Sequence, residues 1–162
     1  MNFKMSVRAI SLAVGIVALC AGCATNGGNF PTAVAAVPLS ILYETPSLAE
    51  ELGKSGIKDR FSDYWQAHAS KNWKLRYELE KFPRPLEEKF YVAYHANAWS
   101  LRSVKVTGVQ QTSLEVTVDL VLSLVDPEKK SDIVQYQKDK WVMVEGSWRH
   151  VVQDPMLTGS FQ

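Results

Sequence analysis

The chain has 162 residues, of which 46% are hydrophobic, and its 18 Lys and Arg side chains nearly balance 17 Asp and Glu, for a formal net charge of +1. This balance excludes a strongly basic nucleic-acid binder and an acidic disordered tail. The length suffices for one domain whose hydrophobic core needs no disulfide support.

Residues 1–22 have the three parts of a secretory signal peptide. Lys4 and Arg8 come first, an uncharged apolar run follows from residue 9 to residue 20, and Ala21 and Gly22 close the segment. As a helix the apolar run reaches about 18 Å, short of the ~30 Å hydrocarbon core, which argues against a permanent membrane span. We therefore expect residues 1–22 to be cleaved off, which changes the formal net charge of the remainder to −1.

The sequence Ala21-Gly22-Cys23 resembles the end of a bacterial lipoprotein signal, the lipobox, although Cys20 stands where that family usually has Leu. The resemblance implies that Cys23 is the lipid attachment site and the first residue of the mature, palmitate-bearing protein. Ala24 in the next position implies sorting to the periplasmic face of the outer membrane. An ordinary signal peptide cut near residue 23 is the alternative. With Cys20 removed and Cys23 acylated, no thiol is left for a disulfide, a nucleophile or a metal site.

Residues 23–40 are expected to be a tether between the lipid and the domain. They carry no charge and include two prolines, a Gly-Gly pair and many small side chains, a composition that gives reach rather than a fixed structure. The alternative is that this segment packs as an extended edge through Val34, Val37 and Leu39.

Two helices are predicted next. Thr45 is a suitable N-cap for a short helix that begins at Pro46 and stops at Gly53. The clearest helix covers residues 59–81, where aromatic residues recur at i, i+3 and i+4 on one face, with a break near residues 70–72. A proline-containing stretch, residues 82–85, then stops the helix, because proline lacks the amide donor and restricts the residue before it.

Helical spacing resumes over residues 86–98, although Phe90 to Val92 could also start a strand. Beyond Trp99 the pattern changes to alternation of apolar and polar residues, which predicts strands. The stretches that alternate or are rich in strand-forming residues are 101–107, 114–119, 133–144 and 147–153. Gly146 lies in the tight turn between the last two, and we expect it to adopt positive φ.

Helices followed by long antiparallel strands predict an α+β domain rather than a parallel α/β fold. We place this domain at residues 41–155 and treat residues 156–162 as a C-terminal tail.

Two stretches of the domain resemble the NTF2-like (SnoaL-like) superfamily. These are Tyr64-Trp65-Gln66-Ala67 with Asn72-Trp73, and the run from Trp141 to Val151 with the pattern Trp-x-x-x-x-Gly-x-Trp-x-x-Val. The resemblance implies N-terminal helices packed in a strongly curved antiparallel sheet, a cone with a pocket opening between sheet and helices. Such cones host isomerases, dehydratases, cyclases, binding proteins and adaptors, so the resemblance implies a fold and leaves the activity open.

Catalytic members of that superfamily place an Asp or a His–Asp pair inside the cone, where burial tunes the base. The sequence offers as candidates His68, His95, His150, Asp63 and Asp119. Spacing alone brings no two of these together. His68 shares the aromatic helix face, but a lone histidine there is more often a packed core residue, and Asp119 is expected on the solvated face of its strand. We therefore assign no catalytic residue.

Aromatic side chains are the remaining signal, because each buries a large area and can line a cavity. The candidate pocket residues are Tyr64, Trp65, His68, Tyr94 and Trp141. The alternative is that they simply fill the cone. We predict no metal and no cofactor, since the three histidines are scattered and neither a phosphate-binding glycine loop nor a nucleophile motif occurs.

Together these features predict a lipoprotein of the outer membrane with a periplasmic NTF2-like domain that acts in binding or assembly. The alternative is a small-molecule-binding protein or an isomerase- or dehydratase-type enzyme that uses a His or Asp in the cone. Expected partners are the membrane, through the lipid, and a protein partner or second copy, through the sheet. Nucleic acid is not expected, because acidic residues surround the basic residues of the long helix.

Overall fold

The computed structural model describes residues 39–159, which fall within a compact unit, Ala35–Gln162. The predicted signal peptide, Cys23 and most of the predicted tether lie outside the described residues. The helices are α1 (Pro46–Lys54), α2 (Lys58–Ala69), α3 (Trp73–Glu78), α4 (Glu88–His95) and α5 (Pro155–Thr158). The strands are β1 (Ile41–Tyr43), β2 (Glu80–Lys81), β3 (Ser100–Gln111), β4 (Glu115–Val125), β5 (Asp132–Val144) and β6 (Ser147–Val151). None of the helices within residues 39–159 is long and apolar enough to cross a membrane.

All six strands form one sheet in the order β1-β3-β4-β5-β6-β2. The fold class is α+β, as predicted, and β3 to β6 form the expected antiparallel meander. Two short strands that the sequence did not predict extend this meander, and they pair in parallel, β1 with β3 and β2 with β6. The chain runs from β1 through α1, α2 and α3 to β2 and then through α4 to β3, so the edge strands are connected by helices rather than by tight hairpins.

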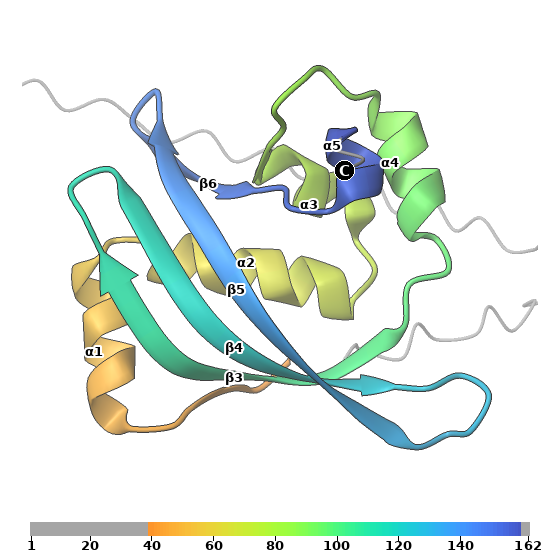
Figure 1. Ribbon diagram of the computed structural model, residues 1–162, viewed down its shortest axis with the longest axis horizontal. Helices are drawn as coiled ribbons and strands as arrows, with labels where there is room; N and C mark the ends of the chain where they lie inside the picture. The colour runs from red at the N-terminus through yellow and green to blue at the C-terminus, as the bar shows by residue number, and fades with distance from the viewer. Residues whose placement is uncertain (1–38, 160–162) are drawn as a thin grey trace, which may run out of the picture. The chain divides into compact units, whose positions relative to one another are not determined.

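The sheet bends around the helices because β3 is irregular. Its register against β4 shifts between Leu101 and Ser103 and again between Val106 and Gly108, and such bulges increase local twist. Figure 1 shows the long strands β3, β4 and β5 sweeping across α2. Alternation along β4 buries every second side chain from Val116 to Leu122 on the inner face. The helices thus lie in the concave side of the sheet.

A first core fills that concave side. Its buried members come from α1, α2 and the inner faces of β3, β4, β5 and β6. Phe61 and Tyr64 from α2 both pack against Trp141 of β5, with ring centroids 6.2 and 5.6 Å apart. Edge-to-face and tilted aromatic pairs of this kind add to the stabilisation that area burial gives. The interior between α2 and the sheet is therefore occupied by side chains.

A second core lies between α3, α4 and the end of the chain. Trp73, Tyr91, Val152 and Leu157 are buried together there. Leu157 belongs to α5 and is only 2% exposed. The C-terminal tail expected from residue 156 is therefore wrong for its first residues, because Asp154 caps α5 by accepting a hydrogen bond from the Met156 N–H at 2.9 Å and the helix packs on the domain.

Helix boundaries follow the predicted signals with two corrections. The expected break near residues 70–72 separates α2 from α3, and Asn72 caps α3 by accepting from the Leu75 N–H at 3.2 Å. The helix predicted to reach residue 81 ends at Glu78, because Glu80 and Lys81 pair with β6 instead. Gly53 lies inside α1 and does not stop it; the glycine with positive φ after this helix is Gly56.

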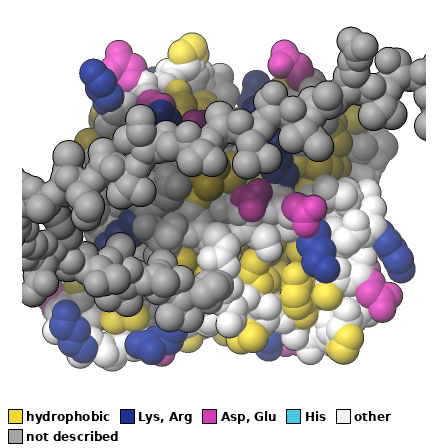
Figure 2. Space-filling view, turned by 180° about the vertical axis from the view of Figure 1, so that it is seen from behind, with side chains coloured by type: hydrophobic (Ala, Val, Ile, Leu, Met, Phe, Trp, Pro, Cys, Tyr) yellow, Lys and Arg dark blue, Asp and Glu magenta, His cyan; other side chains and the backbone are white. Residues whose placement is uncertain are grey.

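The outer face of the sheet carries cross-strand ion pairs. Lys138 Nζ lies 3.0 Å from Asp119 Oδ1, and Lys140 Nζ lies 2.7 Å from Glu115 Oε2. Asp119 is therefore on the outer face, as expected. Figure 2, seen from the opposite side to Figure 1, shows Lys and Arg scattered among Asp, Glu and hydrophobic side chains on the part of the surface that is visible.

Candidate functional site

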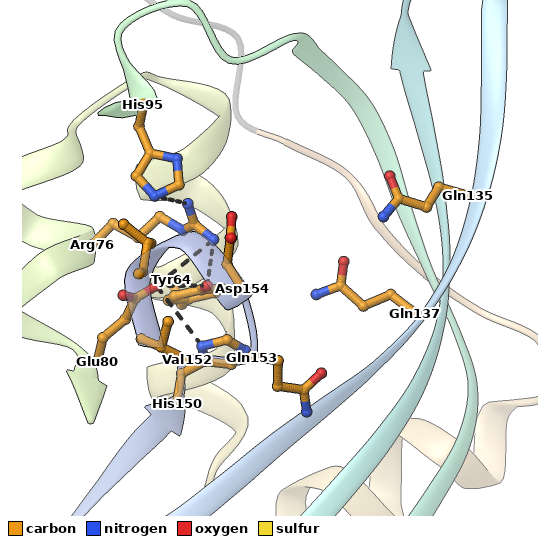
Figure 3. A pocket seen from close by; sticks show the side chains of 11 residues that line it. Tyr64, Arg76, Glu80, His95, Gln135, Gln137, His150, Val152, Gln153 and Asp154 are labelled. Carbon is orange, nitrogen blue, oxygen red and sulfur yellow. Dashed lines mark hydrogen bonds and ion pairs between the residues drawn. The ribbon is translucent and has the colours of Figure 1, made fainter. Parts of the chain in front are cut away.

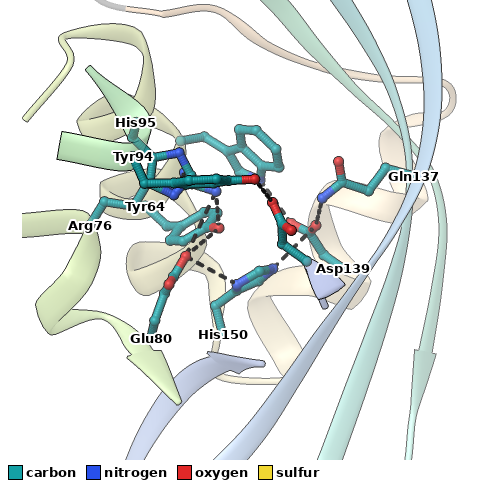
Figure 4. A network of polar contacts seen from close by, with 10 residues as sticks. Tyr64, Arg76, Glu80, Tyr94, His95, Gln137, Asp139 and His150 are labelled. Carbon is teal, nitrogen blue, oxygen red and sulfur yellow. Dashed lines mark hydrogen bonds and ion pairs between the residues drawn. The ribbon is translucent and has the colours of Figure 1, made fainter. Parts of the chain in front are cut away.

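A cluster of polar side chains is buried at the end of the first core that faces α3 and α4 (Figure 4). Its members are Tyr64 from α2, Arg76 from α3, Glu80 from β2, Asp139 from β5 and His150 from β6, and all five are buried. Five separate elements thus meet at one point. Burying several ionisable groups is unfavourable unless they pair, so the contacts among them decide what the cluster can do.

Arg76 is the cation of the cluster. Its Nη2 donates to the Tyr64 hydroxyl and lies 3.7 Å from Glu80 Oε1, while the guanidinium sits 4.6 Å from the centre of the Tyr64 ring. Burial lowers the pKa of Arg76, but Tyr64, Tyr91 and Glu80 raise it, and the net shift is upward. The guanidinium is therefore charged at any physiological pH. Its Nε is buried without a hydrogen-bond partner among the described residues.

Glu80 contacts the same Tyr64 hydroxyl as Arg76. Its Oε1 accepts a hydrogen bond from Tyr64 at 3.0 Å, while Oε2 is buried without a partner of good geometry in the described part of the chain. Burial raises the pKa of Glu80, and Arg76 and His150 offset only part of that rise. The parallel pairing of Glu80 with His150 in the sheet register fixes this carboxylate beside the histidine.

His150 lies between two carboxylates. Its Nε2 is 3.4 Å from Asp139 Oδ1 and its Nδ1 is 3.9 Å from Glu80 Oε1. Asp139 also accepts hydrogen bonds from Trp65 Nε1 at 3.0 Å and from Gln137 Nε2 at 2.8 Å. The imidazole stacks on the Tyr64 ring at 4.2 Å. Both ring nitrogens of His150 are therefore buried within 4 Å of a carboxylate, and neither makes a hydrogen bond to the described residues.

A cavity of about 350 Å³ opens beside this cluster (Figure 3). Tyr64, Arg76, Glu80 and His150 form its inner wall, and Asp154 lies at its rim. Gln135 and Gln137 project from β5 toward that wall from the far side of the cavity. Other surface cavities reach similar volumes, but this one has a buried Arg, Glu and His together in its wall. It is the candidate site.

Two further histidines flank the cluster and are held neutral. His68 packs between the rings of Trp65 and Trp73, at 5.6 and 5.2 Å, and burial, followed by the charge of Arg76, lowers its pKa to about 3. His95 stacks on Trp73 at 5.2 Å with Nε2 3.5 Å from Arg76 Nη1. Burial and Arg76 lower its pKa to about 4. Neither imidazole carries charge at neutral pH.

Of the five residues predicted to line a pocket, only Tyr64 lines the cavity. Trp65 and Trp141 are fully buried and fill the core, as the alternative had it. His68 is packed away from the cavity between tryptophans. Tyr94 is 37% exposed and donates a hydrogen bond at 2.7 Å to Asp154, which lines the cavity.

The residues that sequence reasoning missed are Arg76, Glu80 and Asp139. Arg76 was assigned to a solvated helix face, but it points inward and is 8% exposed. Asp139 carried a usable signal, since alternation along β5 puts it on the same face as Trp141. Glu80 carried none, because its position depends on a two-residue strand that only forms against β6.

The other acidic candidates lie away from the cavity. Asp63 is exposed on α2, and Asp119 lies in its ion pair on the outer face of the sheet. Within residues 39–159 no group of three or more His, Cys, Asp or Glu side chains is placed to hold a metal ion.

No known protein family and no curated protein matches this sequence. Among solved structures, the chain is similar to a SEC-C motif protein from Rhodopseudomonas palustris, with a TM-score of 0.49 and 12% identity over 59% of this chain and 74% of that one. A protein assigned as an NTF2-like transpeptidase, from Campylobacter jejuni, gives a TM-score of 0.42 and 10% identity over 61% and 100%. A protein assigned as a calcium/calmodulin-dependent protein kinase type II association domain, from Thiobacillus denitrificans, gives 0.44 and 12% over 68% and 93%. Likenesses this distant carry no argument about function.

Proposed function

We propose that this chain is an outer-membrane lipoprotein whose periplasmic domain, of NTF2-like type, binds a polar ligand or partner without catalysing a reaction. The cavity beside Arg76 is the observation that carries the binding role. Its wall holds the permanently charged guanidinium of Arg76 next to Glu80, and the Arg76 Nε is buried without a hydrogen-bond partner among the described residues. A polar group entering the cavity can satisfy donors and acceptors that the described part of the chain leaves open.

The ligand is polar rather than apolar because of what lines the cavity. Three glutamine amides, Gln135, Gln137 and Gln153, face the space from β5 and from the segment after β6. An amide both donates and accepts hydrogen bonds, so the lining suits neutral hydrogen-bonding groups. Apolar side chains are a minor part of this wall, limited to Val152 and Leu157.

An acid–base enzyme is the second candidate, and the contact between His150 and Asp139 at 3.4 Å favours it. A general base must reach the proton that it removes. Here both nitrogens of His150 are buried near carboxylates, and the ring packs against Tyr64 and Trp141. Because neither nitrogen is accessible from the cavity, binding is the better account of this arrangement.

The binding role can be tested with residues 24–162, which contain the whole compact unit. Acetamide, acetate and methylammonium serve as neutral, negative and positive probes, with cyclopentane as an apolar control. We expect at least one polar probe to shift the side-chain Nε–H resonance of Arg76 in nuclear magnetic resonance spectra and cyclopentane to leave it unchanged. Gln135→Leu, at an exposed position of the lining, should weaken that response. If no polar probe moves the Arg76 resonance, the binding role is wrong.

Support for the lipid anchor comes from the order of charged, apolar and small residues before Cys23. Acyl chains contribute about 0.8 kcal/mol per buried CH₂, so several together hold a protein firmly at a membrane. Mass spectrometry of the full chain expressed in a Gram-negative host should find diacylglycerol and a third acyl group on Cys23. Cys23→Ser should abolish acylation and Cys20→Ser should preserve it. An unmodified N-terminus near residue 23 would identify an ordinary signal peptide instead.

A further inference from the structure

One long edge of the sheet has no strand beside it within the described residues. β5 runs from Asp132 to Val144, but β6 pairs with it only from Trp141 to Val144. Figure 1 shows β6 turning away from β5 toward α5 while β5 continues past the helices. The first half of β5 therefore has β4 on one side and an open edge on the other.

The register decides which backbone groups face that edge. Met143 N–H donates to the Leu114 carbonyl on the β4 side, at 3.2 Å. Pairing with β4 is continuous from Asp132 to Val142, without a bulge, and successive residues of a strand direct their backbone groups to opposite sides. The even-numbered residues Val134, Tyr136 and Lys138 thus direct N–H and C=O away from β4. These are hydrogen-bonding groups that a further strand could use.

This edge lacks the usual protection against pairing. Edge strands are commonly blunted by charges, prolines or bulges. Lys138 is the one charge in the stretch from Val134 to Lys138, and its ammonium is held by Asp119 on β4, at 3.0 Å, on the side away from the edge. Tyr136 and Val134 are 80% and 57% exposed on the outer face. An extended chain beside β5 would cover these two side chains.

The candidate site lies directly beside the same edge. Gln135 and Gln137, the odd-numbered residues of this stretch, direct their side chains to the inner face and into the cavity. An added strand would therefore place alternate side chains in the cavity next to Arg76 and the others beside Tyr136. Backbone pairing and side-chain recognition would act on one segment.

The cavity lies between the open half of β5 and the segment that follows β6. Gln135 and Gln137 of β5 line it together with Asp154 and Leu157, so an added strand would lie between these two parts of the domain. Neighbouring strands lie about 4.8 Å apart.

We propose that the ligand of the candidate site is an extended polypeptide segment of a partner protein that adds as a strand to the open edge of β5. The inference rests on the binding role proposed above and names its partner. Side chains that enter the cavity are neutral and hydrogen-bonding, because three glutamine amides line it and the opposite charges of Arg76 and Glu80 lie 3.7 Å apart. Side chains on the other face are β-branched or aromatic, as suits neighbours of Val134 and Tyr136.

The test uses residues 24–162 and an acetylated, amidated peptide, Val-Thr-Val-Gln-Val-Thr-Val-Lys-Lys, whose lysines supply solubility. Hydrogen exchange of individual amides is the decisive readout. We expect the peptide to slow exchange at Val134, Tyr136 and Lys138 by about tenfold or more. Amides of Gln135 and Gln137 already pair with β4 and serve as internal controls.

Two matched comparisons separate backbone pairing from side-chain contact. Tyr136→Pro removes the edge-facing N–H, whereas Tyr136→Ala removes the ring and keeps the N–H. We expect Tyr136→Pro to weaken peptide binding by about tenfold or more and Tyr136→Ala to weaken it less. Should Tyr136→Pro fail to fold, a peptide N-methylated at alternate residues, with the protein unchanged, makes the same comparison.

Several outcomes would overturn strand addition. If the peptide shifts the Arg76 resonance but leaves exchange at Tyr136 unchanged, the site recognises side chains without adding a strand. If small polar probes bind and the peptide does not, strand addition is wrong as well. In both cases the binding role itself stands.

Protection of the even-numbered amides before peptide is added would show that the edge is already occupied. If that protection rises with protein concentration the occupant is a second copy, and if it is lost on deletion of residues 24–38 the occupant is the chain's own N-terminal segment.

Discussion

Asp139 links the buried cluster to helix α2 and to its own strand β5. It has no exposed surface, and its two oxygens accept from Trp65 on α2 and Gln137 on β5 while one of them faces His150. A carboxylate can accept hydrogen bonds from the Trp65 and Gln137 donors at once, whereas an amide of the same shape has only one oxygen that accepts. Replacing the Asp139 carboxylate by an amide should therefore leave one of these buried donors unpaired.

We expect Asp139→Asn to lower the free energy of unfolding by about 1–3 kcal/mol, the usual result of leaving a buried polar group unsatisfied. Asp119→Asn is the matched control, because Asp119 sits on the neighbouring strand in a partly exposed ion pair and should cost less than about 1 kcal/mol. Urea denaturation of residues 24–162 measures both. Equal losses would mean that the Asp139 contacts do not matter to stability.

At the scale of single elements, the β5–β6 hairpin depends on its two turn residues. Glu145 and Gly146 both have positive φ, at 49° and 77°, which is the conformation of a two-residue turn that matches the twist of the strands. The positive φ expected for Gly146 is confirmed. Glycine adopts positive φ without strain, whereas a residue with a Cβ atom is strained in this conformation.

Two glycine substitutions should therefore have opposite signs. Gly146→Ala should destabilise the domain by about 1–2 kcal/mol through backbone strain alone, since an added Cβ would meet nothing within 4 Å. Gly53→Ala, inside α1, should stabilise it by up to about 1 kcal/mol, since its Cβ would only touch Lys58 at 4.0 Å. Thermal unfolding monitored by circular dichroism distinguishes the two. The same sign for both would contradict this account.

The terminal helix α5 provides a second test at this scale. Leu157 is 2% exposed in the second core, whereas the adjacent Met156 is 53% exposed. Leu157→Ala should lower the free energy of unfolding by about 2–4 kcal/mol, because it leaves a cavity among Trp73, Tyr91 and Val152. Met156→Ala should change it by less than about 0.5 kcal/mol. A small change in the free energy of unfolding at both positions would mean that α5 does not pack on the domain and that the predicted C-terminal tail was right.

For the molecule as a whole, the partly buried histidines His68 and His95 couple stability to pH. The folded-state pKa of His68 is about 3, below its ordinary value of 6.5. The unfolded chain therefore binds a proton below about pH 6.5 that the folded domain does not, so stability is fully present above that pH and is lost as pH falls toward 3. His95 acts in the same direction. Glu80 opposes them, because its raised pKa makes the folded domain hold a proton that the unfolded chain releases.

We expect the free energy of unfolding to fall between pH 7.5 and pH 5.0, with His68 contributing up to about 1.4 kcal/mol per pH unit below pH 6.5. His68→Gln should reduce that fall, although Arg76, His95 and Lys71 remain around the position. Denaturation at both pH values, for the protein and the variant, measures the difference. An unchanged pH dependence in the variant would mean that His68 titrates normally.

Local order followed from the sequence because it depends on neighbours in the chain. The aromatic face of α2, the break before α3 and the alternation of β3 and β4 are each set by side chains that must be buried at fixed spacing. The short strands β1 and β2 left no such pattern. Their existence depends on pairing with β3 and β6, residues more than sixty positions away.

Composition and periodicity are enough to predict an α+β order of elements, an aromatic core and a distinctive N-terminal segment. Which polar residues matter depends on the folded domain, because sheet register and helix packing, rather than spacing, bring together Tyr64, Arg76, Glu80, Asp139 and His150. The tertiary structure also decides that β5 keeps an open edge beside the cavity. Whether a strand has a neighbour is a property of the whole sheet, and no local pattern encodes it.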